Sequence, residues 1–361
     1  MNILNIVFSF QSGGIENLLV DTLNCWPHAE DQQILCVVNH DYNPALLQRL
    51  NREKIELLLL EREKKTGLIR PLCKIRKALA GSKIDIIHCH NMSAVKFAVL
   101  YKLMGGTGRI VYTVHDTQIA SCYSALDVCI INIAVKQIVA ISEAVRKDIL
   151  GAASVRPGIM VVHNGIDFKR FEGVMPACVP VKTLGMIARI VPEKKGQELL
   201  IRAMEKVISE HPEISVIFAG EFPDDGGLVR ERLMKAAEEN GVTKHIHFLG
   251  NVNDIPGFMS SIDALILPSY YEGFGIVLIE AMAGRRPVIA SDLEGPREII
   301  GDDKYGQLFP KGDAEALSNA IIDLVENGGK DVNIVYEYAL TQYSIQSACC
   351  KLRDTYMNVK K

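Results

Sequence analysis

Two carboxylates, Glu272 and Glu280, lie on either side of the glycine-bearing turn Gly273-Phe274-Gly275. If the backbone between them were helical, they would be roughly 12 Å apart along the helix axis. That is about the span of a diphosphate with a sugar at each end. The glycines can bring backbone N–H groups to the start of the following helix, where unpaired donors and the helix dipole favour phosphate. The spacing therefore predicts a site for a nucleotide-sugar, with a hydroxylated ring near each carboxylate.

Two cations, Arg189 and Lys195, lie between an expected strand and an expected helix. An arginine at a strand end offers a fork of donors to phosphate oxygens, and a lysine before a helix start adds a point charge. Lys194 is adjacent, so the sequence leaves the phosphate-facing lysine open between the two. Lys195 is preferred because it directly precedes Gly196.

Histidines close two further strands. His115 ends the expected strand 110–115, at the carboxyl edge where open α/β sheets bind ligands. His88 and His90 close the strand 84–90 and point to the same side. No third ligand follows at a suitable spacing, so these two histidines are interpreted as cleft-lining or packing residues. There is also no Asp-x-Asp at a strand end, and we expect no metal and no cofactor.

Apolar strands that alternate with helical patterns indicate how these side chains are positioned. The alternation runs twice along the chain, which predicts two Rossmann-like, doubly wound parallel-sheet domains that face each other across a cleft. We expect an N-terminal, acceptor-side domain over 1–175 and a C-terminal donor domain over 183–340, joined by a linker at 173–182. A C-terminal helix over 341–361 is expected to pack back toward the first domain.

Composition limits the class of protein. The 361 residues are 48% hydrophobic and 23% charged, with a net charge of −3, which is ordinary for a globular protein and gives no sign of nucleic-acid binding. Neither a signal peptide nor a spanning run is recognised, so a cytoplasmic location is expected. The nine cysteines include no C-x-x-C pair. Cys36, Cys89 and Cys129 lie in apolar runs and are expected to be buried thiols.

A predicted helix over 68–80 carries Arg70, Lys74 and Lys77 on one face. This pattern is typical of the solvated face of a surface helix. It also fits a basic interfacial helix that docks on anionic lipid at the inner face of a membrane. The sequence leaves both interpretations open.

The stretch 263–300 contains, in order, a strand, Pro-Ser, Glu-Gly-Phe-Gly, the second glutamate and an Ala-Met-Ala-Gly tail. It closely resembles the E-x7-E motif of retaining GT-B glycosyltransferases, specifically glycosyltransferase family 4 of the group 1 type. The Gly-Gly-Ile-Glu loop that contains Gly14 and the Asn-Gly-Ile-Asp turn at 164–167 also resemble family motifs, and the latter is expected to be structural. Two departures occur. An extra lysine lengthens the family's R-L-x3-K-G, and Phe222 replaces the second glycine of the turn that begins at Gly220.

The resemblance implies transfer of a sugar from a nucleoside diphosphate to an acceptor hydroxyl, with retained anomeric configuration. It implies that Glu280 binds the ribose, that Glu272 binds the donor sugar, and that His115 contacts the donor sugar or the acceptor. The remaining donor-side residues implied are Arg189, Lys195, Gly14, Gly220, Gly273, Phe274, Gly275 and Ile276. The expected partners are a nucleotide-sugar donor and a carbohydrate or lipid-linked acceptor, in surface-polysaccharide or glycolipid assembly.

Two other functions fit the same architecture. A nucleotide-sugar 2-epimerase would convert its donor without an acceptor. A non-catalytic nucleotide-sugar-binding module would bind the donor and release no nucleoside diphosphate. The combination of Arg189, Lys195, Glu272 and Glu280 argues against the binding module, which has no need of all four residues.

Overall fold

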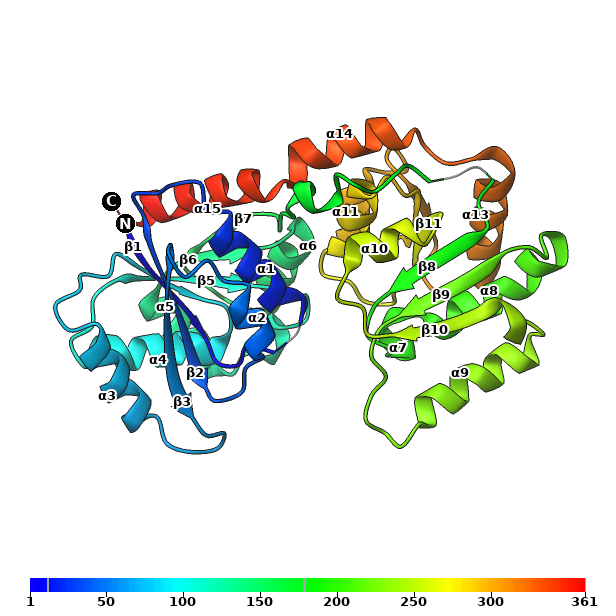
Figure 1. The fold of residues 1–361 in the computed structure, drawn as a ribbon. Coiled ribbons are helices and arrows are strands. Elements are labelled where there is room, and N and C mark those ends of the chain that lie inside the picture. The colour runs from blue at the N-terminus through cyan, green and yellow to red at the C-terminus, as the bar shows by residue number, and fades with distance from the viewer. Residues whose placement is uncertain (12, 178–179, 361) are drawn as a thin grey trace. The chain divides into compact units, whose positions relative to one another are not determined.

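The computed structural model describes residues 1–11, 13–177 and 180–360, so part of the predicted linker and residue 361 lie outside the described residues. The contacts divide the chain into two compact units (Figure 1). Unit 1 comprises Met1–Asp167 together with Tyr343–Lys361, and unit 2 comprises Phe168–Gln342.

Unit 1 is built on a seven-stranded parallel sheet of order β3-β2-β1-β4-β5-β6-β7. In the central strands the apolar runs are buried almost end to end, as a parallel sheet covered on both faces requires. In register, Ile6 lies opposite Cys36 on one side and Cys89 on the other. The strands are β1 (Asn2–Val7), β2 (Gln32–Asn39), β3 (Ile55–Arg62), β4 (Ile86–Cys89), β5 (Arg109–Val114), β6 (Val135–Ala140) and β7 (Gly158–Val161).

Most helices of unit 1 connect these strands, and four of them begin at a side-chain cap. The Asn91 side chain accepts from the backbone N–H of Ala94, and Ser124 and Asp127 form a capping box. The helices are α1 (Gly14–Asn24), α2 (Pro44–Gln48), α3 (Ile69–Ala78), α4 (Met92–Leu103), η1 (Ala120–Cys122), α5 (Ala125–Ala134), α6 (Glu143–Ala152) and α15 (Ile345–Lys360).

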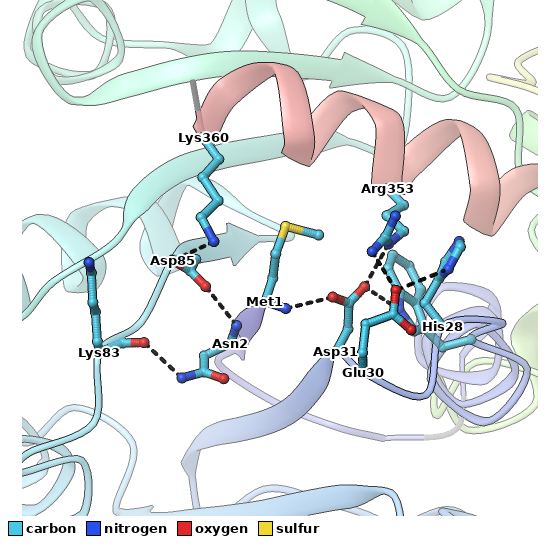
Figure 2. Close-up of polar contacts among 10 residues, drawn as sticks. Met1, Asn2, His28, Glu30, Asp31, Lys83, Asp85, Arg353 and Lys360 are labelled. Carbon is cyan, nitrogen blue, oxygen red and sulfur yellow. Dashed lines mark hydrogen bonds and ion pairs between the residues drawn. The ribbon is translucent and has the colours of Figure 1, made fainter.

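The C-terminal helix α15 is part of unit 1. Its apolar residues share a core with β4, β5 and β6. Figure 2 shows the polar contacts that hold it: Arg353 Nε donates to the buried Asp31 carboxylate at 2.8 Å, and Lys360 pairs with Asp85 at 3.1 Å. The chain enters α15 beside the Asn-Gly turn, where a Cβ on Gly165 would lie 2.6 Å from the Ser344 carbonyl oxygen. Only glycine allows this close approach, which agrees with the structural role predicted for the turn.

Unit 2 has a six-stranded parallel sheet of order β10-β9-β8-β11-β12-β13. Its core packs α8 and α13 against the sheet. The strands are β8 (Thr183–Ile187), β9 (Ser215–Ala219), β10 (Ile246–Gly250), β11 (Ala264–Leu267), β12 (Val288–Ser291) and β13 (Gln307–Phe309). The helices are η2 (Phe168–Phe171), α7 (Pro192–Lys195), α8 (Gln197–Glu210), α9 (Leu228–Glu239), η3 (Thr243–His245), α10 (Ile255–Ser260), α11 (Ile276–Ala283), α12 (Glu294–Ile300), α13 (Ala314–Asn327) and α14 (Val332–Tyr343).

The predicted fold class of two doubly wound parallel-sheet domains is confirmed. The expectation that the named cysteines are buried is right for Cys36 and Cys89 and wrong for Cys129, which is exposed. Cys129 lies on α5, which the sequence did not predict. The segment is apolar almost throughout, and its only buried residues are Asp127 and Ile131. Without a polar face there was no helical period to detect.

Candidate functional site

In unit 2 the carboxyl ends of neighbouring strands meet at one edge of the sheet, and Gly220 holds two of them together. The N–H of Gly220 donates to the Gly250 carbonyl at 2.7 Å. Its φ is +155°, and a Cβ at this position would lie 1.9 Å from the Ala188 carbonyl oxygen. Glycine is therefore required where the chain leaving β9 crosses the end of β8, directly before Arg189.

Gly196 separates the short helix α7 from α8 in a left-handed conformation, with φ of +78°. A Cβ here would lie 2.0 Å from the Pro268 carbonyl oxygen, at the end of β11. The loop after Pro268 is held to the same helix, because the N–H of Tyr270 donates to the Lys194 carbonyl at 2.8 Å. The α7–α8 junction and the β11 loop are thus in direct backbone contact.

This contact brings Lys195 and Glu272 together. Lys195 Nζ lies 2.8 Å from Glu272 Oε2, and the hydroxyl of buried Ser269 lies 3.3 Å from the same oxygen. The side chains of Lys195 and Glu272 are 25% and 16% exposed, so both can be reached from solvent while their stems are packed. Lys194 is more exposed and contributes its backbone carbonyl to the loop.

Arg189 lies at the end of β8 with an exposed side chain. Its guanidinium makes no hydrogen bond or ion pair to any residue that the structure describes. Its carbonyl accepts from Gln197 Nε2 at 3.0 Å, and Gln197 is completely buried as the first residue of α8. Sequence reasoning missed Gln197 as a positioning residue. An amide directly after a left-handed glycine at a helix start was the available signal.

The second glutamate lies on α11, which begins at Ile276 after Gly275 with φ of +98°. The N-cap residue is Gly275 itself, which has no side chain to cap this helix. The preceding Gly273-Phe274 backbone is buried against the start of α12, where a Cβ on Gly295 would meet it at 2.9 Å. Glu280 is partly exposed on the second turn of α11. Only the part of the E-x7-E stretch from Ile276 onward is helical, so the predicted separation of the carboxylates along a single helix axis does not apply.

This edge of unit 2 combines an exposed guanidinium, a lysine–glutamate pair and a helix start that follows a glycine turn on one strand-loop-helix framework. Cations and the N–H groups at a helix start can bind the oxygens of an anion, and the carboxylates can accept from hydroxyl groups. The arrangement can therefore hold a polyanion that carries hydroxylated groups.

In unit 1 the predicted histidines form a column in which His88 is buried, while His90 and His115 are half-buried. His90 Nδ1 lies 3.1 Å from His115 Nε2, while His88 bonds to the Thr113 hydroxyl at 2.6 Å and to the Tyr356 hydroxyl at 2.7 Å. Burial lowers the pKa of His115 to about 4, and burial together with the charge of His115 lowers the pKa of His88 to about 3. The pKa of His90 is also well below its usual range, chiefly through burial. All three imidazoles are therefore neutral at pH 7.

Neutrality constrains the His90–His115 pair. One ring must donate and the other accept in the bond between them. The two remaining nitrogens, His90 Nε2 and His115 Nδ1, are buried and have no hydrogen-bond partner among the described residues. One of them is therefore an N–H and the other a lone pair. Both residues line a pocket in unit 1 that also contacts Glu16.

Gly14 is the first residue of α1 and is exposed. A Cβ there would meet nothing within 4 Å, so packing does not require glycine. At Gly13, by contrast, a Cβ would lie 2.4 Å from Glu16 Oε2, because that carboxylate folds back over the helix start. Glu16 is thus the first-turn acidic residue of α1, where its negative charge interacts favourably with the helix dipole.

No group of three or more His, Cys, Asp or Glu side chains that could hold a metal ion occurs within 1–11, 13–177 and 180–360. In the same part of the chain, no helix is both long and apolar enough to cross a membrane.

Comparison with known proteins shows the family and the fold. The family described as Glycosyltransferase Family 4 matches residues 12–170, and the family described as Glycosyl transferases group 1 matches residues 179–341. The chain is similar to the phosphatidyl-myo-inositol mannosyltransferase of Mycolicibacterium smegmatis, with 28% identity over 70% of this chain and 65% of that enzyme, just under two thirds of its length. It is also 30% identical to the lipopolysaccharide core biosynthesis mannosyltransferase LpcC of Rhizobium leguminosarum, over 49% of this chain and 54% of that protein.

Solved structures share the fold at low identity. Anabaena HepE, determined in complex with UDP, is 22% identical with a TM-score of 0.82, and the match covers 99% of this chain and 100% of HepE. A glycosyltransferase from Rickettsia africae is 19% identical with a TM-score of 0.85, covering 100% and 98%. The two family models, which match residues 12–170 and 179–341, give the family, and the two parallel-sheet units with the structural matches give the fold. The protein belongs to glycosyltransferase family 4, of the group 1 type, and has the GT-B fold.

Proposed function

We propose that this protein is a retaining glycosyltransferase that moves a sugar from a nucleoside-diphosphate donor to an acceptor hydroxyl. The observation that carries the proposal is the Lys195–Glu272 contact of 2.8 Å, at the same sheet edge as the exposed Arg189. Departure of a nucleoside diphosphate develops negative charge on phosphate oxygens, and fixed cations at that point lower the barrier.

Each residue of the donor site then has a task. Arg189 and Lys195, with the backbone N–H groups that precede and begin α11, hold the diphosphate. Glu280 accepts from the ribose hydroxyls, and Glu272 accepts from the donor sugar. When the donor binds, Lys195 pairs with its phosphate and Glu272 accepts hydrogen bonds from its sugar. These contacts replace the ion pair between the lysine and the glutamate. The departing phosphate oxygen assists removal of the acceptor proton, which gives attack on the same face and retention. The positive charge comes from side chains, so no metal is required.

The acceptor is proposed from the relatives. Their names specify phosphatidyl-myo-inositol in one case and the lipopolysaccharide core in another. These names support a lipid-linked or polysaccharide acceptor. A lipid-linked acceptor would require membrane contact, and we propose that the enzyme makes it from the cytoplasm, at the inner face of the membrane. HepE binds UDP, which supports a nucleoside diphosphate as the leaving group.

A thermal-shift panel of nucleoside diphosphates and their sugars tests donor use, because a ligand of the native state raises the melting temperature by mass action. The donor found is then supplied with candidate acceptors, and the anomeric configuration of the product is read by NMR. Glu280→Ala should abolish stabilisation by the donor and reduce turnover by about 10²-fold or more. Glu315→Ala, which removes an exposed carboxylate from the first turn of α13, serves as the matched control.

Other results of the same assays would contradict the proposal. Full turnover in a folded Glu280→Ala variant would refute the donor assignment. Conversion of the donor to an epimer without any acceptor would identify an epimerase. Tight donor binding with no nucleoside diphosphate released in any acceptor screen would identify a binding module.

A further inference from the structure

The outer surface of α3, α4 and α5 forms a continuous face of unit 1, here called the α3–α5 face. The helices pack in series, α3 against α4 and α4 against α5. Arg76 Nε on α3 donates to the Met104 carbonyl at the end of α4, at 3.0 Å. Lys96 on α4 pairs with Asp127 on α5 at 2.6 Å. The three helices therefore present one surface.

Large apolar side chains are exposed on this face. On α5, Leu126 is 64% exposed and Ile133 is 75% exposed, and the exposed Cys129 lies between them. Their spacing of three and four residues places them on one side of the helix. Single exposed apolar residues are ordinary, but here they continue onto the neighbouring helices. The further members are Ile69 at 77%, Leu103 at 78% and Met104 at 41% exposed.

The same face is strongly basic. Within α3, α4 and α5 there are six basic residues and a single acidic one, Asp127. Asp127 is buried and already paired with Lys96, so it presents no free negative charge to the surface. The basic region continues past α4 to Lys136 and Arg109. Their charges add to the effect of burial in lowering the pKa of Lys102. The six basic residues are Arg70, Lys74, Arg76, Lys77, Lys96 and Lys102.

We propose that the α3–α5 face docks on the surface of an anionic phospholipid bilayer. Its aliphatic side chains would enter the boundary between headgroups and acyl chains, while Arg70, Lys74 and Lys77 pair with lipid phosphates. The basic charge of the face favours an anionic bilayer as its partner. A second copy docked through the same face would bring like charges together without carboxylates to pair them.

The docking needs no donor and no catalysis. Docking would bring the enzyme to the surface that holds a lipid-linked acceptor, and only this consequence rests on the proposed function. The sequence left open whether the basic face of α3 is solvated or binds lipid. In this proposal the basic face of α3 and the apolar side of α5 contact the same bilayer.

Co-sedimentation with phosphatidylcholine vesicles, with and without phosphatidylglycerol, tests the proposal on the full chain. Binding should require the anionic lipid and should weaken as salt rises. Leu126→Ser with Ile133→Ser should reduce partitioning about tenfold or more, because two aliphatic insertions are lost. Arg70→Glu with Lys74→Glu and Lys77→Glu should reduce it by about 10²-fold or more.

The matched control is Leu228→Ser with Ile334→Ser, which removes two apolar residues of unit 2 that are 67% and 62% exposed. This variant should bind vesicles like the unaltered protein. Circular dichroism and thermal melting establish that each variant is folded, and Leu126→Ser alone replaces the double variant if that one does not fold. Release of nucleoside diphosphate during sugar transfer to a water-soluble acceptor should be unchanged in all folded variants. This readout separates a docking failure from a failure of the proposed function.

Binding to neither vesicle, or equal binding to both, would overturn the proposal. So would equal losses in the α5 and control variants. Sedimentation velocity without lipid supplies the remaining outcome. A dimer that dissociates when Leu126 and Ile133 are replaced would make the face an interface between copies of the chain instead.

Discussion

Replacing Gly196 by alanine should damage the donor site without changing any side chain that touches the donor. Gly196 has φ of +78°, and the new Cβ would lie 2.0 Å from the Pro268 carbonyl oxygen. Real Cβ atoms hardly ever come closer than 3.0 Å, so the two backbones must separate by about 1 Å. That movement pushes the α7–α8 junction away from the β11 loop, and with it Lys195 away from Glu272.

The magnitude follows from two costs. The left-handed conformation costs an alanine about 1 kcal/mol relative to glycine, and overpacking against the Pro268 carbonyl adds about 1–3 kcal/mol. Gly241→Ala isolates the first cost, because Gly241 has φ of +67° in the same unit and a Cβ there would meet nothing within 4 Å. Urea unfolding should therefore show a loss of about 1 kcal/mol for Gly241→Ala and about 2–4 kcal/mol for Gly196→Ala.

Turnover should separate the two variants further. A misplacement of about 1 Å at a reacting centre costs about 10²-fold, so Gly196→Ala should lose about that much while Gly241→Ala stays within about twofold. The reasoning is refuted if folded Gly196→Ala matches Gly241→Ala in both unfolding free energy and turnover.

Three further predictions concern charge. Arg189→Ala and Lys195→Ala should each lower turnover by about 10²-fold, because each removes a positive charge that stabilises the leaving diphosphate. Lys194→Ala is the control, and equal losses of turnover at Lys194 and Lys195 would contradict the assignment. Turnover should be unaffected by EDTA and by added Mg²⁺ or Mn²⁺, and activation by either metal would count against catalysis by side-chain cations alone. The free energy of unfolding should fall as pH drops from about 6.5 toward 4, by about 2 kcal/mol each for His88 and His115 by pH 5, because the unfolded imidazoles bind protons that the folded ones do not. His88→Asn should make that fall shallower by about the same amount, and an unchanged pH profile of urea unfolding would oppose the argument.

The fold class could be predicted because it depends on local patterns. Each buried parallel strand is a short apolar run, and each helix that packs one face on a sheet shows a period of 3.6 residues. The loop from Ser269 to Glu280 was also readable, since strand, turn and helix start are contiguous in the chain. The elements that escaped lacked such a pattern: α5 is apolar almost all round, and β13 spans only Gln307–Phe309.

The sequence by itself thus determined the architecture and the residue types of the donor loop. Only the tertiary structure decided which side chains meet. Lys195 reaches Glu272 across 77 residues because β11 pairs with β8, while β9 and β10 lie on the other side of β8. Tyr356 reaches His88 across 268 residues because α15 packs onto the sheet of unit 1. Strand order and helix docking follow from burying apolar surface cooperatively over a whole unit, and no short segment carries that information.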